Sequence, residues 1–186
     1  MELDLDPRLI DAHRDELAGQ LEAAAALYER YLADAPEQGQ TAGVHKHLGN
    51  LHFRLGHLRR AREHLARACD LDPANAACWH DLGVIEYHMA EFDESVRAFR
   101  RALDLDPGLH LAYYWLGNAL YHRGELHDAA RTFQLLVEQS PNFTVARFHL
   151  GVIYARQGDR ERAETEFRRV LLKNPEDVAA RFYIER

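Results

Sequence analysis

A period of 34 residues runs through most of this sequence and constrains its fold more than any other feature. The dipeptide Leu-Gly recurs at Leu48-Gly49, Leu82-Gly83, Leu116-Gly117 and Leu150-Gly151. Prolines repeat the same spacing independently, at Pro73, Pro107, Pro141 and Pro175. Pro36 precedes Pro73 by 37 residues, so we interpret Gly39-Gln40-Thr41 as a three-residue insertion. A strict period of this length predicts stacked copies of one structural unit.

Within each period the residue types predict two closely packed helices. Four small residues, Ala61, Ser95, Ala129 and Ala163, are followed four positions later by Leu65, Phe99, Phe133 and Phe167. A glycine in one helix and a small residue in the other let two backbones approach, and the large side chain fills the adjacent space. The prolines end one helix and precede the next. Turn glycines are expected at Gly56, Gly124 and Gly158, with Ala90 at the equivalent place.

These residues resemble the tetratricopeptide repeat, a pair of antiparallel helices. Four repeats fall at 42–75, 76–109, 110–143 and 144–177. A degenerate repeat at 5–38 keeps Gly19, Ala24, Tyr28 and Pro36 but has Asp11-Ala12 in place of Leu-Gly. Residues 178–186 are either a short C-terminal cap helix or a truncated repeat. The resemblance implies one all-α domain over 1–186, a right-handed α-solenoid whose first helices line a concave face.

Two departures from the family pattern concern local packing rather than the fold. His45 and Arg147 stand where Trp79 and Tyr113 stand in their own repeats. The four positions are equivalent by the period, so neighbouring repeats must accommodate different side chains at one site. The sequence does not predict how they do so.

Charge and apolar patterning limit the classes of partner and location. The net charge of −7 disfavours binding to nucleic acid or to anionic membranes, and the basic run 54–68 is interpreted as a solvated outer face. No apolar run approaches the roughly 20 residues of a membrane helix, and the first ten residues do not resemble a signal peptide. We therefore expect a cytoplasmic protein without membrane insertion. Cys69 and Cys78 are expected to be reduced, packed thiols.

The segment 112–125 carries two stripes of side chains on one predicted helix. Tyr113, Leu116 and Leu120 share a face that should pack against Phe133. Residues at the spacing i, i+4, i+7 and i+8 form a second stripe, which the resemblance places on the concave face: Tyr114, Asn118, Tyr121 and His122.

The same stripe in the other repeats completes a predicted peptide-binding groove. Aromatic rings supply contact area, asparagine can bond to a peptide backbone, and cations can pair with acidic groups. For Phe53, Tyr87 and Tyr121 the alternative is packing against the second helices. The predicted groove residues are Lys46, Asn50, Phe53, Arg54, His80, Tyr87, His88, Tyr114, Asn118, Tyr121, His122, Phe148 and Arg156.

One specialised mode of recognition does not fit. Some family members hold the C-terminal carboxylate of heat-shock chaperones between lysine, asparagine and arginine side chains of three repeats. Lys46 and Asn50 match the first two of these groups, but the remaining places hold Asp81, Leu111 and Trp115. Asp81 would repel a carboxylate, so this clamp is not expected.

Catalytic and metal-binding patterns are not found in the sequence. There is no nucleophile elbow, phosphate-cradling glycine loop or HExxH motif, so we expect neither an enzyme nor a cofactor. The chain has twelve histidines, but His45 and His47 point to different sides of a helix. His80, His88 and His122 could converge across adjacent repeats, and we favour a pH response of these groove histidines over a metal site.

Two functions remain. The first is a protein-interaction scaffold or adaptor whose groove binds an extended peptide or a helix of a partner. The alternative is a structural self-assembly module, or the repeat part of a larger protein, with oligomer contacts at Phe182, Tyr183 and Ile184 near the C-terminus. The identity of the partner and the pathway do not follow from the sequence.

Overall fold

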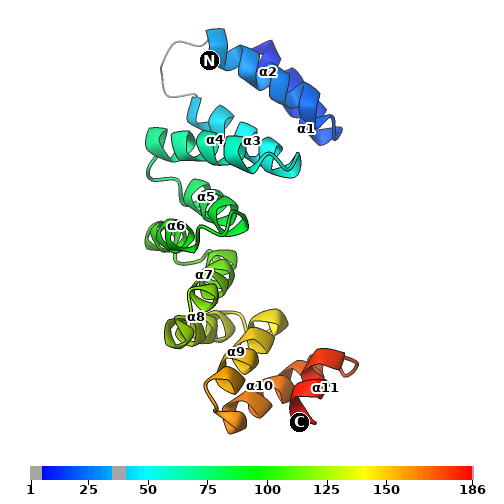
Figure 1. The fold of residues 1–186 in the computed structure, drawn as a ribbon. Coiled ribbons are helices and arrows are strands. Elements are labelled where there is room, and N and C mark those ends of the chain that lie inside the picture. Colours follow the sequence, from blue (N-terminus) through cyan, green and yellow to red (C-terminus); the bar gives the residue numbers. More distant parts are fainter. Residues whose placement is uncertain (1–5, 35–40, 186) are drawn as a thin grey trace. The chain divides into compact units, whose positions relative to one another are not determined.

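The structure is a computed structural model that describes residues 6–34 and 41–185. Pro36 and the expected insertion at Gly39-Gln40 lie outside the described residues, and Thr41 begins a helix. Eleven α-helices make up the regular structure of the described residues (Figure 1). They are α1 (Pro7–Leu17), α2 (Leu21–Asp34), α3 (Thr41–Arg54), α4 (Leu58–Leu71), α5 (Ala76–His88), α6 (Phe92–Leu105), α7 (His110–His122), α8 (Leu126–Gln139), α9 (Thr144–Arg156), α10 (Arg160–Lys173) and α11 (Val178–Ile184).

The chain divides into two compact units, Met1–Ala90 and Glu91–Arg186. In the first unit, α1 packs on α2 and α3 on α4, and α5 packs on α4. In the second unit, α7 packs on α8 and α9 on α10, while α6 packs on α7 and α11 on α10. The predicted all-α architecture of consecutive helix pairs is confirmed.

Turns between paired helices depend on a left-handed backbone residue. Gly19, Gly56, Gly124 and Gly158 adopt φ values of 76°, 78°, 82° and 79°. Ala90 takes the same role with φ 61°, although its Cβ disfavours this conformation. The expected equivalence of Ala90 with the turn glycines is therefore correct, and Ala90 is a strained member of the set.

The predicted close approach of paired helices is present at three Leu-Gly sites. A Cβ added to Gly117 would lie 2.7 Å from ring carbons of Phe133. A Cβ at Gly151 would lie 2.9 Å from the ring of Phe167, and one at Gly49 would lie 2.5 Å from Leu65. Because all three large side chains are fully buried, each glycine is required by packing across its own helix pair.

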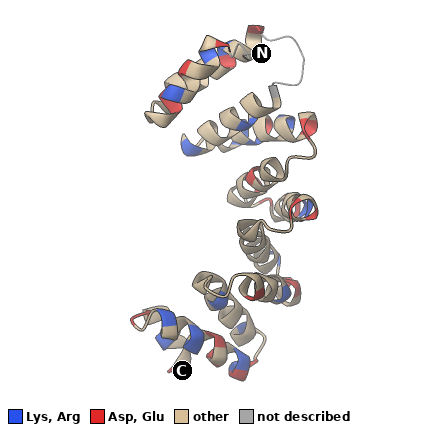
Figure 2. Ribbon diagram, turned by 180° about the vertical axis from the view of Figure 1, so that it is seen from behind, with Lys and Arg blue, Asp and Glu red and all other residues tan. Residues whose placement is uncertain are grey.

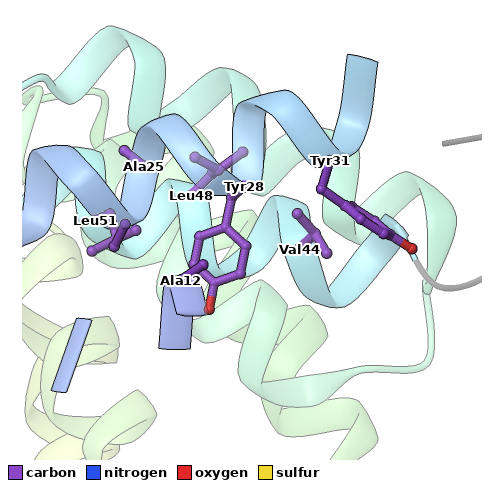
Figure 3. Packing of buried hydrophobic residues seen from close by; sticks show 8 residues of the cluster. Ala12, Ala25, Tyr28, Tyr31, Val44, Leu48 and Leu51 are labelled. Carbon is purple, nitrogen blue, oxygen red and sulfur yellow. The ribbon is translucent and has the colours of Figure 1, made fainter. Parts of the chain in front are cut away.

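The degenerate first repeat packs as a helix pair in spite of its missing Leu-Gly. Side chains from α1, α2 and α3 converge in one buried cluster (Figure 3). Ala12 replaces the expected glycine and has no exposed surface. Burial and the nearby Glu16 carboxylate raise the pKa of Tyr28 to about 12. The labelled members of the cluster are Ala12, Ala25, Tyr28, Tyr31, Val44, Leu48 and Leu51.

At the aromatic position of the repeat, Trp79 and Arg147 both donate a hydrogen bond to a proline carbonyl in the preceding loop. Trp79 donates its indole N–H to the carbonyl of Pro73 at 3.1 Å. Arg147, two periods later, donates from Nε to the carbonyl of Pro141 at 3.2 Å, and its Nη1 lies 3.1 Å from buried Glu166. The guanidinium therefore replaces the indole as a donor to the interhelical loop.

Candidate functional site

In the first unit, three of the predicted groove residues, Lys46, Asn50 and His80, contact the carboxylate of Asp81. Asn50 donates from Nδ2 to Asp81 at 3.1 Å, and Lys46 Nζ lies 3.6 Å from the same carboxylate. His80 Nδ1 is also within 3.1 Å of Asp81. Burial disfavours the charged form of Asp81, but the contacts with His80, Asn50 and Lys46 together hold its pKa below the ordinary value.

This arrangement joins α3 to α5 through a carboxylate that belongs to the chain itself. Asp81 takes the place that a ligand carboxylate would need in order to reach Lys46 and Asn50. The sequence-based expectation that Asp81 opposes a carboxylate clamp therefore gains a geometric reason. An acidic partner group would therefore compete with Asp81 for this pair.

The C-terminal end of α3 is also engaged within the first unit. Arg54 Nη1 lies 3.8 Å from Glu16, and His47 Nδ1 lies 3.1 Å from the same carboxylate. Phe53 is half-buried, and its ring centroid lies 5.2 Å from that of His88. These contacts link neighbouring first helices, and Phe53 packs against α5.

In the second unit, two predicted groove residues turn inward. The half-buried ring of Tyr114 has its centroid 5.6 Å from Phe143, 5.7 Å from His149 and 6.2 Å from Phe133. Asn118 is only 6% exposed and donates from Nδ2 to the backbone carbonyl of Tyr114 at 2.8 Å. Tyr114 consequently contributes to the packing of α7 on its neighbours, and buried Asn118 offers a partner little surface.

Tyr121 and Arg156 form a more accessible pair. The Arg156 guanidinium lies 5.0 Å from the centroid of the Tyr121 ring, in a cation–π contact that joins α9 to α7. Tyr121 is half-buried and Arg156 is exposed. The exposed His122 ring stacks on Phe92, with centroids 4.9 Å apart and planes 7° apart.

Two exposed apolar residues lie in the first turns of the same two helices and were not among the predicted groove residues. Leu111 is 56% exposed and Val145 is 53% exposed. They lie three positions before Tyr114 and Phe148, one helical turn along the same stripe. Extending the predicted stripe by one turn would have identified both. We call Leu111, Tyr121, Val145 and Arg156 the α7–α9 surface.

Phe148 and the C-terminal residues pack together at the end of the second unit. Phe148 lies 5.6 Å from Phe167 and 6.1 Å from Tyr183 between ring centroids. Tyr183 stacks on Phe167 at 4.6 Å, and Ile184 is half-buried beside it at an open hollow of about 250 Å³. Phe182 is 48% exposed. Thus α11 covers the last helix pair, while an oligomer contact through these residues stays a prediction.

Charged side chains are distributed unevenly over the helices of the second unit. Helix α7 contains no Lys, Arg, Asp or Glu, and it is tan along its length in Figure 2. The second helix α10 instead carries charged pairs such as Arg168–Glu164 at 2.6 Å. The exposed residues of α7 are therefore the apolar Leu111 and the imidazole of His122, and Arg156 of α9 lies over the ring of Tyr121.

The histidines whose pKa values are lowered are not among the predicted groove residues, although His149 contacts Tyr114. Burial lowers the pKa of His45, His52 and His149, and it lowers that of His64 to about 4. Within residues 6–34 and 41–185, no group of three or more His, Cys, Asp or Glu side chains has the geometry to hold a metal ion. The pH response expected of His80, His88 and His122 stays a prediction.

None of the helices in the described part of the chain combines the length and the apolar character needed to cross a membrane.

Comparison with known proteins identifies the repeat family. Two models of the tetratricopeptide repeat match the chain, one over residues 47–110 and 89–142 and the other over residues 124–182. No match was found among curated proteins.

Solved structures of similar fold cover nearly the whole chain. MamA is 24% identical with a TM-score of 0.84, and the match covers 89% of this chain and 95% of MamA. YrrB, described as a TPR protein with an unusual peptide-binding site, is 22% identical with a TM-score of 0.86 over 98% of this chain and 93% of YrrB. MamA from Desulfovibrio magneticus RS-1 is 19% identical with a TM-score of 0.84, covering 91% and 95% of the two chains. At these identities the likeness concerns the fold.

Proposed function

The chain belongs to the tetratricopeptide repeat family, whose fold is that of a protein-interaction scaffold, and we propose that it binds an extended peptide segment of a partner protein. The observation that carries this proposal is the α7–α9 surface, where exposed Leu111 and Val145 accompany the Tyr121–Arg156 pair. The peptide-binding site of YrrB, a protein of similar fold, supports the same mode of binding. We also propose that the protein has no catalytic activity, is cytoplasmic and forms a single domain over residues 1–186.

The chemistry of the surface favours a particular kind of peptide. Leu111 and Val145 would gain from burial by apolar side chains of the partner, at about 25 cal/mol for each Å² removed from water. Tyr121 adds an aromatic face with few rotatable bonds. A carboxylate of the partner would pair with Arg156, whose guanidinium is exposed. We therefore expect apolar side chains at alternate positions and one acidic group near the Arg156 end.

The first-helix residues of the first unit are a second, polar part of the proposal. Their cations Lys46 and Arg54 already contact Asp81 and Glu16. Asn50 still has one amide hydrogen and its carbonyl oxygen for a peptide backbone. A segment bound at this region would gain hydrogen bonds from it and little net charge attraction.

Selection from a displayed library of random peptides, each about a dozen residues long, tests the proposal. Affinities of the selected peptides are then measured for the parent and for Leu111→Glu. The matched control is Leu172→Glu, which makes the same change at an 82% exposed leucine on α10. We expect Leu111→Glu to weaken binding about tenfold or more, equivalent to about 1.4 kcal/mol, and Leu172→Glu to leave it unchanged. Equal affinities for all three proteins would refute this site.

Self-assembly is the second candidate function, favoured by the exposed aromatic residues of α11. Phe182 is 48% and Tyr183 40% exposed although Tyr183 also stacks on Phe167. Light scattering over a wide concentration range, with Phe182→Glu beside the parent, distinguishes the two functions. A dimer that Phe182→Glu dissociates supports self-assembly, whereas a monomer at every concentration excludes it over that range.

A further inference from the structure

Two buried thiols meet where the second helix pair joins α5. Cys69 lies in the last turn of α4, and Cys78 lies in the first turn of α5. Each is 1% exposed, and their sulfur atoms are 2.8 Å apart. A disulfide has an S–S distance of about 2.05 Å, so closing the bond requires the sulfurs to approach by only about 0.8 Å.

Hydrogen bonds and apolar packing hold the two cysteines next to each other in their reduced form. Cys69 donates its S–H to Cys78, and Cys78 donates to the backbone carbonyl of Leu65 at 3.6 Å. Both sulfurs belong to one apolar cluster with Leu65, Leu82 and Ile85. The thiol contact and burial, together with the nearby carboxylate of Asp70, raise the pKa of Cys69 well above its ordinary value. The pair therefore reacts slowly, but each thiol has a partner within reach as soon as one is oxidised.

We propose that Cys69 and Cys78 are an oxidisable dithiol, which a peroxide converts into an intramolecular disulfide that ties α4 to α5. The dithiol then has a reduced state and a disulfide state, and the reduced, packed thiols expected from the sequence are the first of these. This inference does not depend on the proposed peptide-binding function, because it concerns bond formation inside the first unit.

The reaction balances with hydrogen peroxide as the oxidant. The thiolate of one cysteine attacks a peroxide oxygen, the O–O bond breaks, and hydroxide leaves and takes up a proton to become water. The resulting sulfenic acid is attacked at sulfur by the second cysteine, an S–S bond forms, and a second water leaves with the thiol proton. Two thiols and one peroxide thus become one disulfide and two waters. The small size of peroxide suits a pair with so little exposed surface.

The bond would restrain a junction that positions the polar part of the first unit. Residues 69–78 contain the end of α4, the connecting turn and the start of α5. Asp81 follows Cys78 by three residues on α5, and it contacts Asn50 and Lys46 on α3. A covalent link between α4 and α5 therefore limits the opening of α5 away from the α3–α4 pair.

Mass spectrometry of the intact parent after treatment with hydrogen peroxide tests the proposal directly. We expect a loss of about two mass units and the disappearance of both titratable thiols together, reversed by dithiothreitol. Cleavage before Asp70 and Asp72, which lie between the cysteines, should then give two peptides joined only by the disulfide. Because the thiolate is the reactive form, the rate should rise about tenfold for each pH unit between pH 7 and 9.

Cys69→Ala and Cys78→Ala are the matched controls, each leaving one thiol. Circular dichroism establishes that they fold, and neither should lose two mass units. In a Trp115→Phe variant that keeps both cysteines, fluorescence reports on Trp79 of the first unit alone, and oxidation should raise the melting temperature of that unit by on the order of 5–10 °C. Persistence of both thiols, oxygen addition without a cross-link, or disulfides only between molecules would overturn the proposal. An unchanged melting temperature in the cross-linked protein would overturn the restraint on α4 and α5.

Discussion

Acidification is expected to destabilise the first unit through three histidines between α3 and α4. The Nδ1 atoms of His45 and His64 lie 3.0 Å apart, and the rings of His52 and His64 stack with centroids 5.5 Å apart. A hydrogen bond between two Nδ1 atoms requires one of them to be bare, so His45 and His64 cannot both be imidazolium in this arrangement. Both ring nitrogens of buried His52 are without a hydrogen-bond partner among the described residues.

Charged groups on neighbouring helices do not offset the burial of these rings. Glu29 on α2 lies 3.7 Å from His52 Nε2 and favours protonation, as Glu63 does for His64. Arg60 acts against protonation of His52, and Arg67 acts against protonation of His45. Burial is the largest effect on each of the three histidines, and the net direction of each pKa is downward.

The magnitude follows from the pKa of His64, which is about 4 in the folded protein and 6.5 when unperturbed. Between these values the unfolded chain binds the proton and the folded chain does not, so the stabilisation is complete above pH 6.5 and is lost as the pH falls toward 4. At pH 4.5 the linkage gives about 2.5 kcal/mol for His64, or about 2 kcal/mol after allowance for partial solvent access. The shifts of His45 and His52 add to this loss in the same direction.

Urea denaturation at pH 7.5 and pH 4.5 measures the effect. Trp79 lies in the first unit and Trp115 in the second, so Trp115→Phe leaves a fluorescence signal from the first unit alone. We expect His64→Gln to remove about 2 kcal/mol of the pH dependence. The exposed His13 of the same unit supplies the control His13→Gln, which should behave as the parent. An equal loss of stability in His64→Gln and the parent would refute the reasoning.

Two backbone positions give further predictions, each measured by urea denaturation. Gly117→Ala should cost about 1–3 kcal/mol in the second unit, because its Cβ would lie 2.7 Å from the ring of Phe133. Gly43→Ala is its control: no atom of the described residues lies within 4 Å of that Cβ, and a gain of up to about 1 kcal/mol is expected. Ala90→Gly should stabilise the protein by about 1 kcal/mol, because φ 61° is unfavourable for alanine. A stable Gly117→Ala protein, or a destabilised Ala90→Gly protein, would contradict these arguments.

The sequence by itself determined the repeat architecture because the interactions that define it recur within one helix pair. The contact of Gly117 with Phe133 joins residues only 16 positions apart, and Gly151 and Phe167 repeat it at the same spacing. A local rule of this kind is visible as a period, and it predicted the helix pairs and the turn at Ala90.

Tertiary structure decided which of the predicted groove residues are exposed. The sequence placed Tyr114 and Asn118 on the outward stripe, but the rings of Phe143 and His149 enclose Tyr114, and Asn118 turns to its own helix. Leu111 is exposed instead. Helical spacing predicts which face a residue occupies, whereas its exposure depends on side chains contributed by neighbouring helices and loops.

The periodic pattern also did not predict the contacts between different repeats. Asp81 meets Asn50 across 31 residues, and Cys69 meets Cys78 across the turn between two helices. Neither pair repeats along the chain, so no internal comparison within the sequence reveals it. The sequence determined the scaffold through repeated local packing, and only the tertiary structure decided which unrepeated polar and thiol side chains meet, because their encounter depends on how successive helices stack.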